Sequence, residues 1–373
     1  MKAGIVGLPN VGKSNLFNCL SNAKAQSANF PFCTIEPNIG VVNVPDERLD
    51  FLSKLIKPEK VIPATVEILD IAGLVKGASN GEGLGNQFLS NIRETDAILH
   101  VLRCFDDDNI VHVDGSVDPV RDKETIDMEL QLKDMETVEK RQEKLIRTAK
   151  AGNKDAQKEL EILKKIISSL ERAENVRSID FIEDDRTTYV KSLQLLTDKP
   201  VLYVCNVSEN SAAKGNAYVE KVKAAIAKEK CEVLVLAVSI EADINELESY
   251  EERHLFLEDI GLTEPGSVKL IRSAYSLLSL QTFFTAGEKE VRAWTIPKGA
   301  SAPQAAGVIH SDFEKGFIRA EVIAYTDYLA LGSEQKVKEA GIKIYWSHTI
   351  VDTAGYKRLN SVSIMKLSND CLL

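Results

Sequence analysis

Four short apolar runs in the first third of the chain have the length and character of buried strands, at residues 1–6, 39–44, 65–69 and 97–104. Between the second and third runs, Asp46 stands at the N-cap position of a helix whose apolar residues share one face as far as Ile56. Another helix is expected directly after residue 14. Strands that alternate with helices in this order predict a doubly wound α/β sheet of the nucleotide-binding type.

The pattern becomes helical and highly charged between about residues 120 and 196. Apolar residues follow spacings of three and four or their sums, first at Met128, Leu132, Met135, Leu145 and Ala149 and, after a break at 151–153, at Ala156, Leu160, Leu163, Ile167, Leu170 and Ala173. Two such seams joined by a short break predict an antiparallel helical hairpin. Strand character returns at 200–205 and again at 233–238, so the hairpin is expected to be an insertion within the sheet domain.

We therefore expect four segments along the chain. The first part of a P-loop nucleotide-binding domain occupies 1–120, the helical coiled-coil insertion 121–197, and the second part of the nucleotide-binding domain 198–279. Short alternating runs and a Pro–Lys–Gly turn follow within 280–373, which predicts a small mixed α+β module.

Composition is that of an ordinary globular protein, with 44% apolar and 27% charged residues. No apolar run approaches the roughly 20 residues of a membrane span, and the first strand leaves no room for a signal peptide. Six scattered cysteines without a C-x-x-C pair fit a reducing compartment. We therefore expect a cytoplasmic protein with no membrane partner. The net charge of −10 argues against a surface that coats nucleic acid throughout, although local basic patches are compatible with it.

The sequence G-x-x-x-x-G-K-S at residues 7–14 lies between the first predicted strand and the first predicted helix. Glycines in such a loop let backbone N–H groups surround a phosphate chain, and the helix N-terminus adds partial positive charge. Lys13 would neutralise the outer phosphates, and Ser14 would ligate Mg²⁺. A chance glycine turn is the alternative, but the strand–loop–helix context favours a phosphate-binding loop.

Two further groups are placed to act on the metal and on the terminal phosphate. Asp70 ends a strand and begins a D-x-x-G motif, so it can reach Mg²⁺ through water while the N–H of Gly73 meets the γ-phosphate. Thr34 lies in the loop before the second strand, where a hydroxyl can complete the Mg²⁺ shell when a γ-phosphate is present. The alternatives are a plain strand-end turn and an ordinary loop threonine.

The base-reading position holds Asn206-Val207-Ser208-Glu209, where GTPases carry N-K-x-D. Val207 replaces the lysine whose stem packs along the base, and Glu209 is one methylene longer than the aspartate that accepts two hydrogen bonds from guanine. We expect guanine specificity to be lost or weakened, with adenine held by backbone groups and by Asn206. Ser239, at the end of the last sheet strand, is expected to contact the base through its backbone. A strand-end turn unrelated to the base is the alternative.

Leu74 occupies the position of the water-orienting glutamine of Ras-type GTPases, and a leucine cannot orient water. Turnover is therefore slow, or another group takes this role. His112, in an acidic loop after the 97–104 strand, could swing toward the γ-phosphate as a catalytic group, and an exposed loop histidine is the alternative. His100, inside that strand, is expected to be packed. Asn10 can ligate a monovalent cation, K⁺ for example, near the phosphates.

Residues 140–165 of the predicted hairpin carry nine Lys or Arg residues against four acidic ones, in a protein whose net charge is −10. A solvated coiled-coil face is one interpretation of this segment. The other is a basic arm that contacts RNA phosphates.

Together these motifs resemble the YchF/Obg-like ATPase family, a branch of the Obg-related P-loop GTPases. The resemblance runs from residue 1 to about residue 341 and is carried by residues 7–14, 29–38, 70–78, 81–86, 206–209 and 315–321. It implies a nucleotide-binding domain interrupted by a coiled-coil hairpin, then a TGS domain of β-grasp type. It also implies ATP preferred over GTP, Mg²⁺, slow hydrolysis and association with ribosomes. By the same motifs the phosphates are cradled by Asn10, Val11, Gly12, Lys13, Ser14 and Asn15, and Mg²⁺ is ligated by Ser14 and Thr34.

Three functions are compatible with these residues. The leading one is a slow Mg²⁺-dependent ATPase, expected to be a monomer, that switches its contacts with the ribosome, its large subunit or another RNA-rich partner; the hairpin and the TGS domain would contact rRNA. The second is an Obg-type GTPase in which Glu209 still tolerates guanine. The third is a nucleotide-gated ribosome- or RNA-binding module whose hydrolysis is incidental.

The end of the chain, from about residue 342 to 373, departs from the family pattern, which closes with a glycine-rich acidic turn and a final strand. A divergent end or a shifted reading frame near residue 341 would both give this sequence. We expect a poorly packed tail, and strong hydrogen-exchange protection across residues 345–370 would contradict that expectation.

Overall fold

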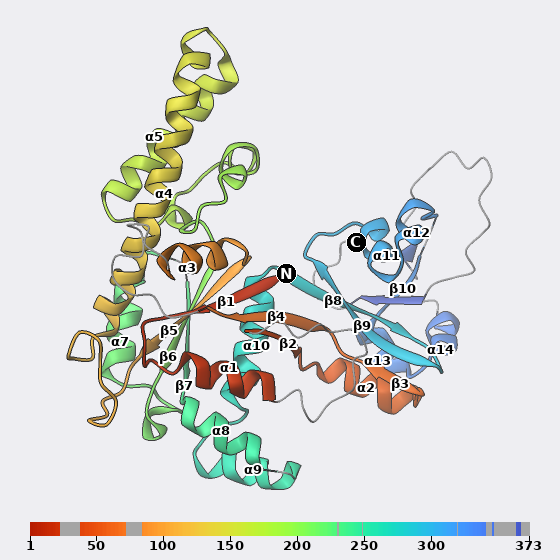
Figure 1. The fold of residues 1–373 in the computed structure, drawn as a ribbon. Helices are drawn as coiled ribbons and strands as arrows, with labels where there is room; N and C mark the ends of the chain where they lie inside the picture. Colours follow the sequence, from red (N-terminus) through yellow and green to blue (C-terminus); the bar gives the residue numbers. More distant parts are fainter. Residues whose placement is uncertain are drawn as a thin grey trace. The chain divides into compact units, whose positions relative to one another are not determined.

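The computed structural model describes residues 1–22, 38–71, 84–229, 231–247, 249–318, 320–340, 345–346 and 363–366. The chain divides into two compact units, which are described separately (Figure 1). Unit 1 comprises Met1–Val42 and Glu67–Leu277, and unit 2 comprises Asn43–Val66 and Leu278–Leu373.

The sheet of unit 1 has six strands in the order β2 (Ile39–Asn43), β4 (Thr65–Asp70), β1 (Lys2–Val6), β5 (Ala97–Arg103), β6 (Val201–Asn206) and β7 (Glu232–Leu236). The pairs from β4 to β7 are parallel. All residues of β5 and β6 are buried, as expected for central strands of a parallel sheet. From β1 the chain forms β2 and then β4 on one side and continues with β5 on the other, so the strand order switches next to β1. Ligands of such sheets bind at the carboxyl ends of the strands at this point.

In the described part of unit 1, the helices that accompany this sheet are α1 (Lys13–Asn22), α3 (Leu84–Arg93), α7 (Ala217–Ala225), α8 (Val238–Glu246), α9 (Tyr250–Asp259) and α10 (Gly266–Leu277). Helix α10 packs against β5, β6 and β7, and α8 packs against α1. The hydrophobic pattern predicts a last strand that runs to Val238, with Ser239 at its end. This boundary is wrong, because Val238 is the first residue of helix α8 and its N–H donates to the side chain of Asn206.

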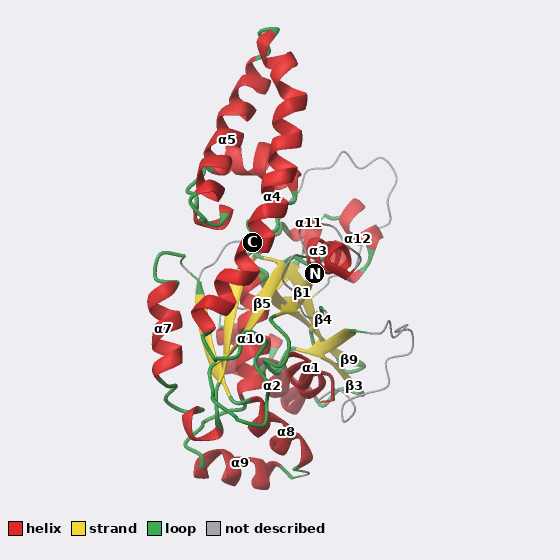
Figure 2. Cartoon of the chain, turned by 60° about the vertical axis from the view of Figure 1, so that its left-hand side comes forward, coloured by secondary structure: helices red, strands yellow, loops and turns green. Residues whose placement is uncertain are grey.

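The inserted hairpin consists of α4 (Pro119–Lys150) and α5 (Lys154–Glu171), which pack against each other and project beyond the sheet (Figures 1 and 2). The predicted break at residues 151–153 is confirmed, and Asn153 caps α5 by accepting from the N–H of Ala156. The chain returns to the sheet through short turns, namely η2 (Val176–Ser178), α6 (Glu183–Asp185), η3 (Arg186–Val190) and η4 (Lys191–Leu193). Among the described residues, no helix is both long enough and apolar enough to cross a bilayer.

The predicted seam of α4 is wrong over its first half. Met128 and Leu132 are 57% and 51% exposed, whereas Ile126 and Leu130 are buried. The buried face there lies against β5 and α7 rather than against α5, and it includes Asp127 and Asp134, which a hydrophobicity pattern assigns to the surface. Farther along, a shared core of Val138, Ile162, Leu163 and Ile166 joins the two helices as expected.

Unit 2 contains a second six-stranded sheet, in the order β11 (Tyr345–Trp346), β10 (Glu321–Ala324), β12 (Ser363–Lys366), β8 (Leu280–Ala286), β9 (Glu290–Pro297) and β3 (Lys60–Ile62). Its helices are α2 (Glu47–Ile56), α11 (Ala302–Ile309), α12 (Ser311–Lys315), α13 (Tyr325–Leu331) and α14 (Glu334–Glu339). The side chains of Phe283, Trp294 and Ile296 pack with alanines of α11 in its core. The mixed α+β architecture is confirmed, while its assignment as a TGS domain rests on the family resemblance.

Residues 43–66 correct the predicted domain boundary. The sequence pattern predicts that they belong to the nucleotide-binding domain, and Asp46 does cap α2 as expected. However, β3 pairs with β9, and Glu59 N–H donates to the carbonyl of Glu288. This segment is therefore part of unit 2. Its separation from β9 by more than two hundred residues hides the pairing from any local pattern.

The tail is described only at β11 and β12. Both strands pair with β10, and β12 also pairs with β8. These six residues therefore form part of the sheet, which differs from the expectation of a poorly packed tail. The other residues of 342–373 lie outside the described part of the chain, and for them the expectation stays a prediction.

Candidate nucleotide-binding site

The loop between β1 and α1 has the backbone geometry that the motif predicts. Asn10 has φ 62° and Gly12 has φ 97°, both left-handed, which asparagine tolerates and glycine adopts freely. A Cβ on Gly12 would lie 2.5 Å from Nδ2 of Asn206, so a larger residue would displace a side chain that holds the loop. The carbonyl of Gly12 then accepts from Leu16 N–H at 2.9 Å as α1 begins.

Lys13 is the first residue of α1 and is 9% exposed. Its burial lowers the pKa of the ammonium group, and the charge of Asp70 acts in the opposite direction. An anionic phosphate chain at this loop would likewise favour the charged form of Lys13. The lysine is thus placed to gain interaction energy when a phosphate binds.

Asp70 and Ser14 are brought together as the sequence predicted. The Ser14 hydroxyl donates to Oδ2 of Asp70 at 3.2 Å, which leaves the lone pairs of Oγ available to a cation. Oδ1 of Asp70 is buried and has no hydrogen-bond partner among the described residues. An unsatisfied buried carboxylate oxygen beside a hydroxyl fits a hydrated Mg²⁺, which prefers oxygen ligands and keeps several waters. Thr34, Gly73 and Leu74 lie outside the described residues.

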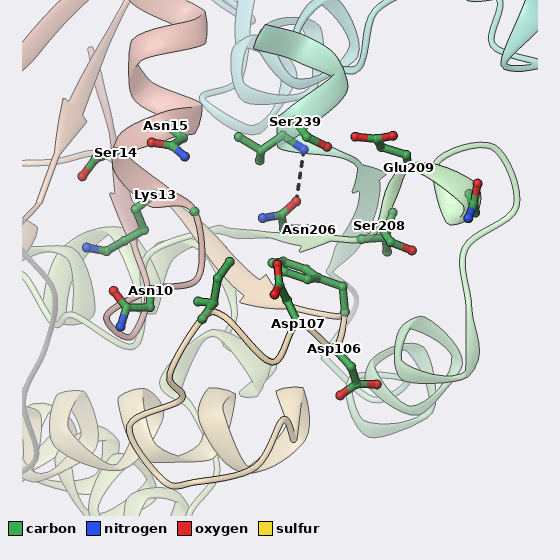
Figure 3. A pocket seen from close by; sticks show the side chains of 16 residues that line it. Asn10, Lys13, Ser14, Asn15, Asp106, Asp107, Asn206, Ser208, Glu209 and Ser239 are labelled. Atoms are coloured by element: carbon green, nitrogen blue, oxygen red, sulfur yellow. Dashed lines mark hydrogen bonds between the residues drawn. The ribbon is translucent and has the colours of Figure 1, made fainter. Parts of the chain in front are cut away.

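Asn206 joins three parts of the site and is 5% exposed. Its Nδ2 donates to the carbonyl of Val11 at 3.0 Å, and its Oδ1 accepts from Val238 N–H at 3.1 Å (Figure 3). The side chain therefore fixes the phosphate loop against the start of α8. One N–H of the Asn206 amide remains for a ligand, because the other N–H and the oxygen are bonded to the protein backbone.

A pocket of about 730 Å³ opens at this edge of the sheet, and its walls come from residues 10, 12–15, 105–107, 110, 206–210 and 238–239. Figure 3 shows Ser14 and Lys13 at one end and Ser208 and Glu209 at the other. Val207 is 2% exposed and hydrogen-bonded through its N–H to Leu236, so it supplies an apolar surface, while Glu209 is exposed. The volume is within the usual range for small-molecule sites.

His112 is placed differently from an exposed loop histidine. It is 8% exposed, its Nε2 lies 2.8 Å from Oδ2 of Asp122 on α4, and its Nδ1 accepts from Asp114 N–H. His112, Asp114 and Asp122 form a group that could hold a metal ion, but Arg121 already contacts both carboxylates. The neighbouring carbonyl of Val111 accepts from Nδ2 of Asn10, so this loop touches the phosphate loop.

His100 is packed, as expected. It is 2% exposed and lies against the ring of Tyr203, and burial lowers its pKa to about 4. It does not line the nucleotide pocket.

The wall formed by Phe105, Asp106, Asp107 and Ile110 was not predicted from the sequence. The feature that could have identified this wall is the position of the loop at the carboxyl end of β5, next to the point where the strand order switches. The strand order is not known from the sequence alone, so these side chains could not be singled out.

Comparison with known proteins agrees with this geometry. A family model described as "50S ribosome-binding GTPase" matches residues 2–150, and a second, "YchF-GTPase_C", described as a protein of unknown function, matches residues 280–348. The second match stops near residue 348, close to where the sequence departs from the family pattern.

Curated relatives match most of the chain. The "Ribosome-binding ATPase YchF" of Bacillus subtilis is 56% identical over 91% of this chain and 93% of its own length, and that of Escherichia coli O157:H7 is 54% identical with the same coverage. The solved "YchF GTPase" of Schizosaccharomyces pombe is 39% identical, with a TM-score of 0.85 over 98% of this chain and 97% of that chain. The resemblance seen in the motifs is confirmed, and the chain belongs to the YchF family.

Proposed function

We propose that this protein is a Mg²⁺-dependent P-loop ATPase with slow turnover, which prefers ATP to GTP and uses the bound nucleotide to switch its contacts with the ribosome. The bacterial relatives are named as ribosome-binding ATPases, which supports the reaction and the partner. We further expect a monomer that acts in the cytoplasm.

The observation that carries the nucleotide preference is the base end of the pocket. Val207 is buried there without the lysine stem that packs on guanine, and Glu209 is an exposed, longer carboxylate. A carboxylate that cannot accept both hydrogen bonds from guanine no longer favours guanine over adenine. If it faced N1 of adenine it would be repelled, unless it turned to solvent. The exposed position of Glu209 allows that turn.

Within the site, Lys13 would hold the outer phosphates, and Ser14 with Asp70 would hold a hydrated Mg²⁺. The ion would supply charge neutralisation for the phosphates. Asn10 donates through Nδ2 to Val111, and its Oδ1 is the oxygen that could meet K⁺. Thr34 and Gly73 are proposed to complete the site when nucleotide is bound, and His112 is the candidate for the group that replaces the missing glutamine.

The test is equilibrium binding of ATP and GTP, with Mg²⁺ and either K⁺ or Na⁺. The same titrations use the double variant Val207→Lys/Glu209→Asp. We expect the wild type to prefer ATP and the variant to move toward GTP. A control, Glu220→Asp, makes the same carboxylate change on the exposed face of α7 and should leave the ratio unchanged.

A wild type that prefers GTP would overturn the proposed specificity and favour the second candidate, a GTPase. The name of the fission-yeast relative, "YchF GTPase", is the specific observation for that candidate. Hydrolysis that neither K⁺ nor the ribosome accelerates, together with nucleotide-dependent binding, would favour the gated binding module instead.

The proposed RNA contact is the end of the hairpin, where Lys144, Arg147, Lys150 and Lys154 are exposed. Within the described residues none of these four forms an ion pair, so their charges are available to phosphates. Reversing Arg147, Lys150 and Lys154 to glutamate should abolish ribosome co-sedimentation. A control that changes the exposed Lys214, Lys221 and Lys228 to glutamate alters the net charge equally and should retain ribosome binding. Unchanged co-sedimentation of the hairpin variant would contradict the proposed RNA contact.

A further inference from the structure

Arg103, the last residue of β5, is among the largest fully buried side chains of the molecule. Its guanidinium donates to three backbone carbonyls: Nε to Phe105 at 3.1 Å, Nη2 to Asp107 at 3.1 Å and Nη1 to Ile110 at 2.9 Å. Within the described residues no carboxylate forms an ion pair with it. A buried cation without a carboxylate is costly, and these carbonyls are the groups that solvate its charge.

The three carbonyls belong to one loop, residues 104–110, and Phe105, Asp106, Asp107 and Ile110 of this loop line the nucleotide pocket. The guanidinium also lies 4.8 Å from the centroid of the Phe105 ring. A planar fork with divergent N–H groups can gather carbonyls that lie two, four and seven residues along the chain. An ammonium group, which is a compact point charge, cannot span them.

The outer side of the same loop is held by helix α7. Nδ2 of Asn216 donates to the carbonyl of Cys104 at 2.7 Å, and the hydroxyl of Tyr218 donates to the carboxylate of Asp106 at 3.0 Å. The loop is thus held both by the guanidinium of Arg103 and by the first residues of α7 with their N-cap. Such anchoring is what a wall needs if it is to present a constant shape to a ligand.

We propose that Arg103 is a positioning residue for recognition of the nucleobase: it shapes loop 104–110 into the wall opposite Val207 and Glu209. Figure 3 shows Asp106 and Asp107 at the same end of the pocket as Ser208 and Glu209, away from Ser14. The aromatic ring of Phe105 and the apolar surface of Val207 then offer two faces to a planar base. This inference rests on the proposed nucleotide-binding function.

The test compares three ligands, each with Mg²⁺: ATP, GTP and tripolyphosphate, which has no base. Arg103→Met should weaken ATP about tenfold or more and bring the ATP and GTP affinities together, because the base wall is no longer held. Tripolyphosphate should bind as tightly as to the wild type within about twofold, because the P-loop is unchanged. Arg103→Lys, which keeps the charge but not the fork, should recover only part of the loss.

Arg177→Met is the control, because the Arg177 side chain is also largely enclosed, at 7% exposed, but lies outside the pocket lining. It should lose stability while the three affinities, measured below its unfolding temperature, keep their wild-type ratios. Wild-type affinities in Arg103→Met, or equal weakening of all three ligands, would overturn the positioning role. If Arg103→Met does not fold, Phe105→Ala must give the same base-selective loss, and an unchanged ATP affinity there overturns the proposal.

A wild type that binds neither ATP nor GTP would instead refute the proposed function. The loop would then be judged by hydrogen exchange of its amides. Arg103→Lys should expose the Ile110 amide, which donates to the Asp107 carbonyl, and unchanged protection would refute the positioning role by itself.

Discussion

The two ends of helix α4 carry many charges and use them in opposite ways. At the root, taken as residues 119–138 with the groups packed on them, Lys123 is paired with Asp127 at 2.8 Å and with Glu229 at 2.6 Å, and Arg177 contacts both acids. At the tip, taken as residues 144–154, the cations are exposed and unpaired within the described residues.

This difference shows that charge content alone does not distinguish a scaffold from a binding surface. Burial by itself would raise the pKa of Asp127, but the charges of Arg177 and Lys123 hold it below its usual range. Removing one member of such a set leaves another buried charge uncompensated. At the tip, water screens each cation, so its removal costs the fold almost nothing. The following predictions test this contrast, from the largest expected effect on stability to the smallest.

Asp134→Ala should lower the free energy of unfolding by roughly 3–5 kcal/mol. Its carboxylate is fully buried and accepts from Leu196 N–H at 2.8 Å, Thr197 N–H at 2.7 Å and the Thr197 hydroxyl at 2.6 Å. Alanine would leave all three donors buried without an acceptor. Urea denaturation measures the loss. Glu143→Ala, on the exposed surface of the same helix, is the control, and similar losses in both variants would contradict the proposed contrast.

Leu163→Ala should lower the free energy of unfolding by roughly 2–5 kcal/mol, because Leu163 is completely buried in the core that joins α4 to α5. The matched change Leu132→Ala should cost less than about 0.5 kcal/mol, because that side chain is 51% exposed. Both residues belong to the hydrophobic pattern of the sequence. Equal effects in thermal or urea unfolding would mean that the first half of α4 does pack through its predicted seam.

His100, which packs at the root of α4, should make the stability of the protein depend on pH. It lies beside Asp127, Lys123, Arg177 and Tyr203, and burial lowers its pKa to about 4. Between its ordinary pKa of about 6.5 and pH 4, only the unfolded chain binds the proton. The free energy of unfolding therefore decreases as the pH is lowered through this range, by up to roughly 1.4 kcal/mol per pH unit. In His100→Asn this contribution should be missing, and the slope of unfolding free energy against pH should be smaller. Parallel pH profiles would show that His100 has the same pKa in the folded and unfolded chains.

The parts of this molecule that were predictable from sequence are those set by near neighbours in the chain. The phosphate loop is formed within a few residues, among them Gly12, Lys13 and Ser14. Strands β5 and β6 are recognisable in the sequence as continuous apolar runs. Asp70 could be placed because a strand end follows directly from the apolar pattern. These features need no knowledge of what packs against them.

The unpredicted parts depend on contacts between distant segments. The wall at Phe105 becomes a wall only because residues 206–210 and 238–239 face the same pocket, and residues 43–66 join unit 2 through a partner strand near residue 290. The root of α4 was misread because buried Asp127 and Asp134 look like surface residues until their partners are known. A pattern of hydrophobicity carries no information about such partners.

The smallest effect on stability is expected at the tip. Lys150→Glu/Lys154→Glu should change the free energy of unfolding by no more than about 0.5 kcal/mol. Both side chains are exposed, one on each side of the break at 151–153, and within the described residues neither forms an ion pair that the change would break. A single charge reversal at the root, Lys123→Glu, should destabilise the protein strongly, because it would place a third carboxylate between Asp127 and Glu229. If the tip variant unfolds as easily as the root variant, the tip cations have structural partners, and their availability for a ribosomal phosphate would have to be abandoned.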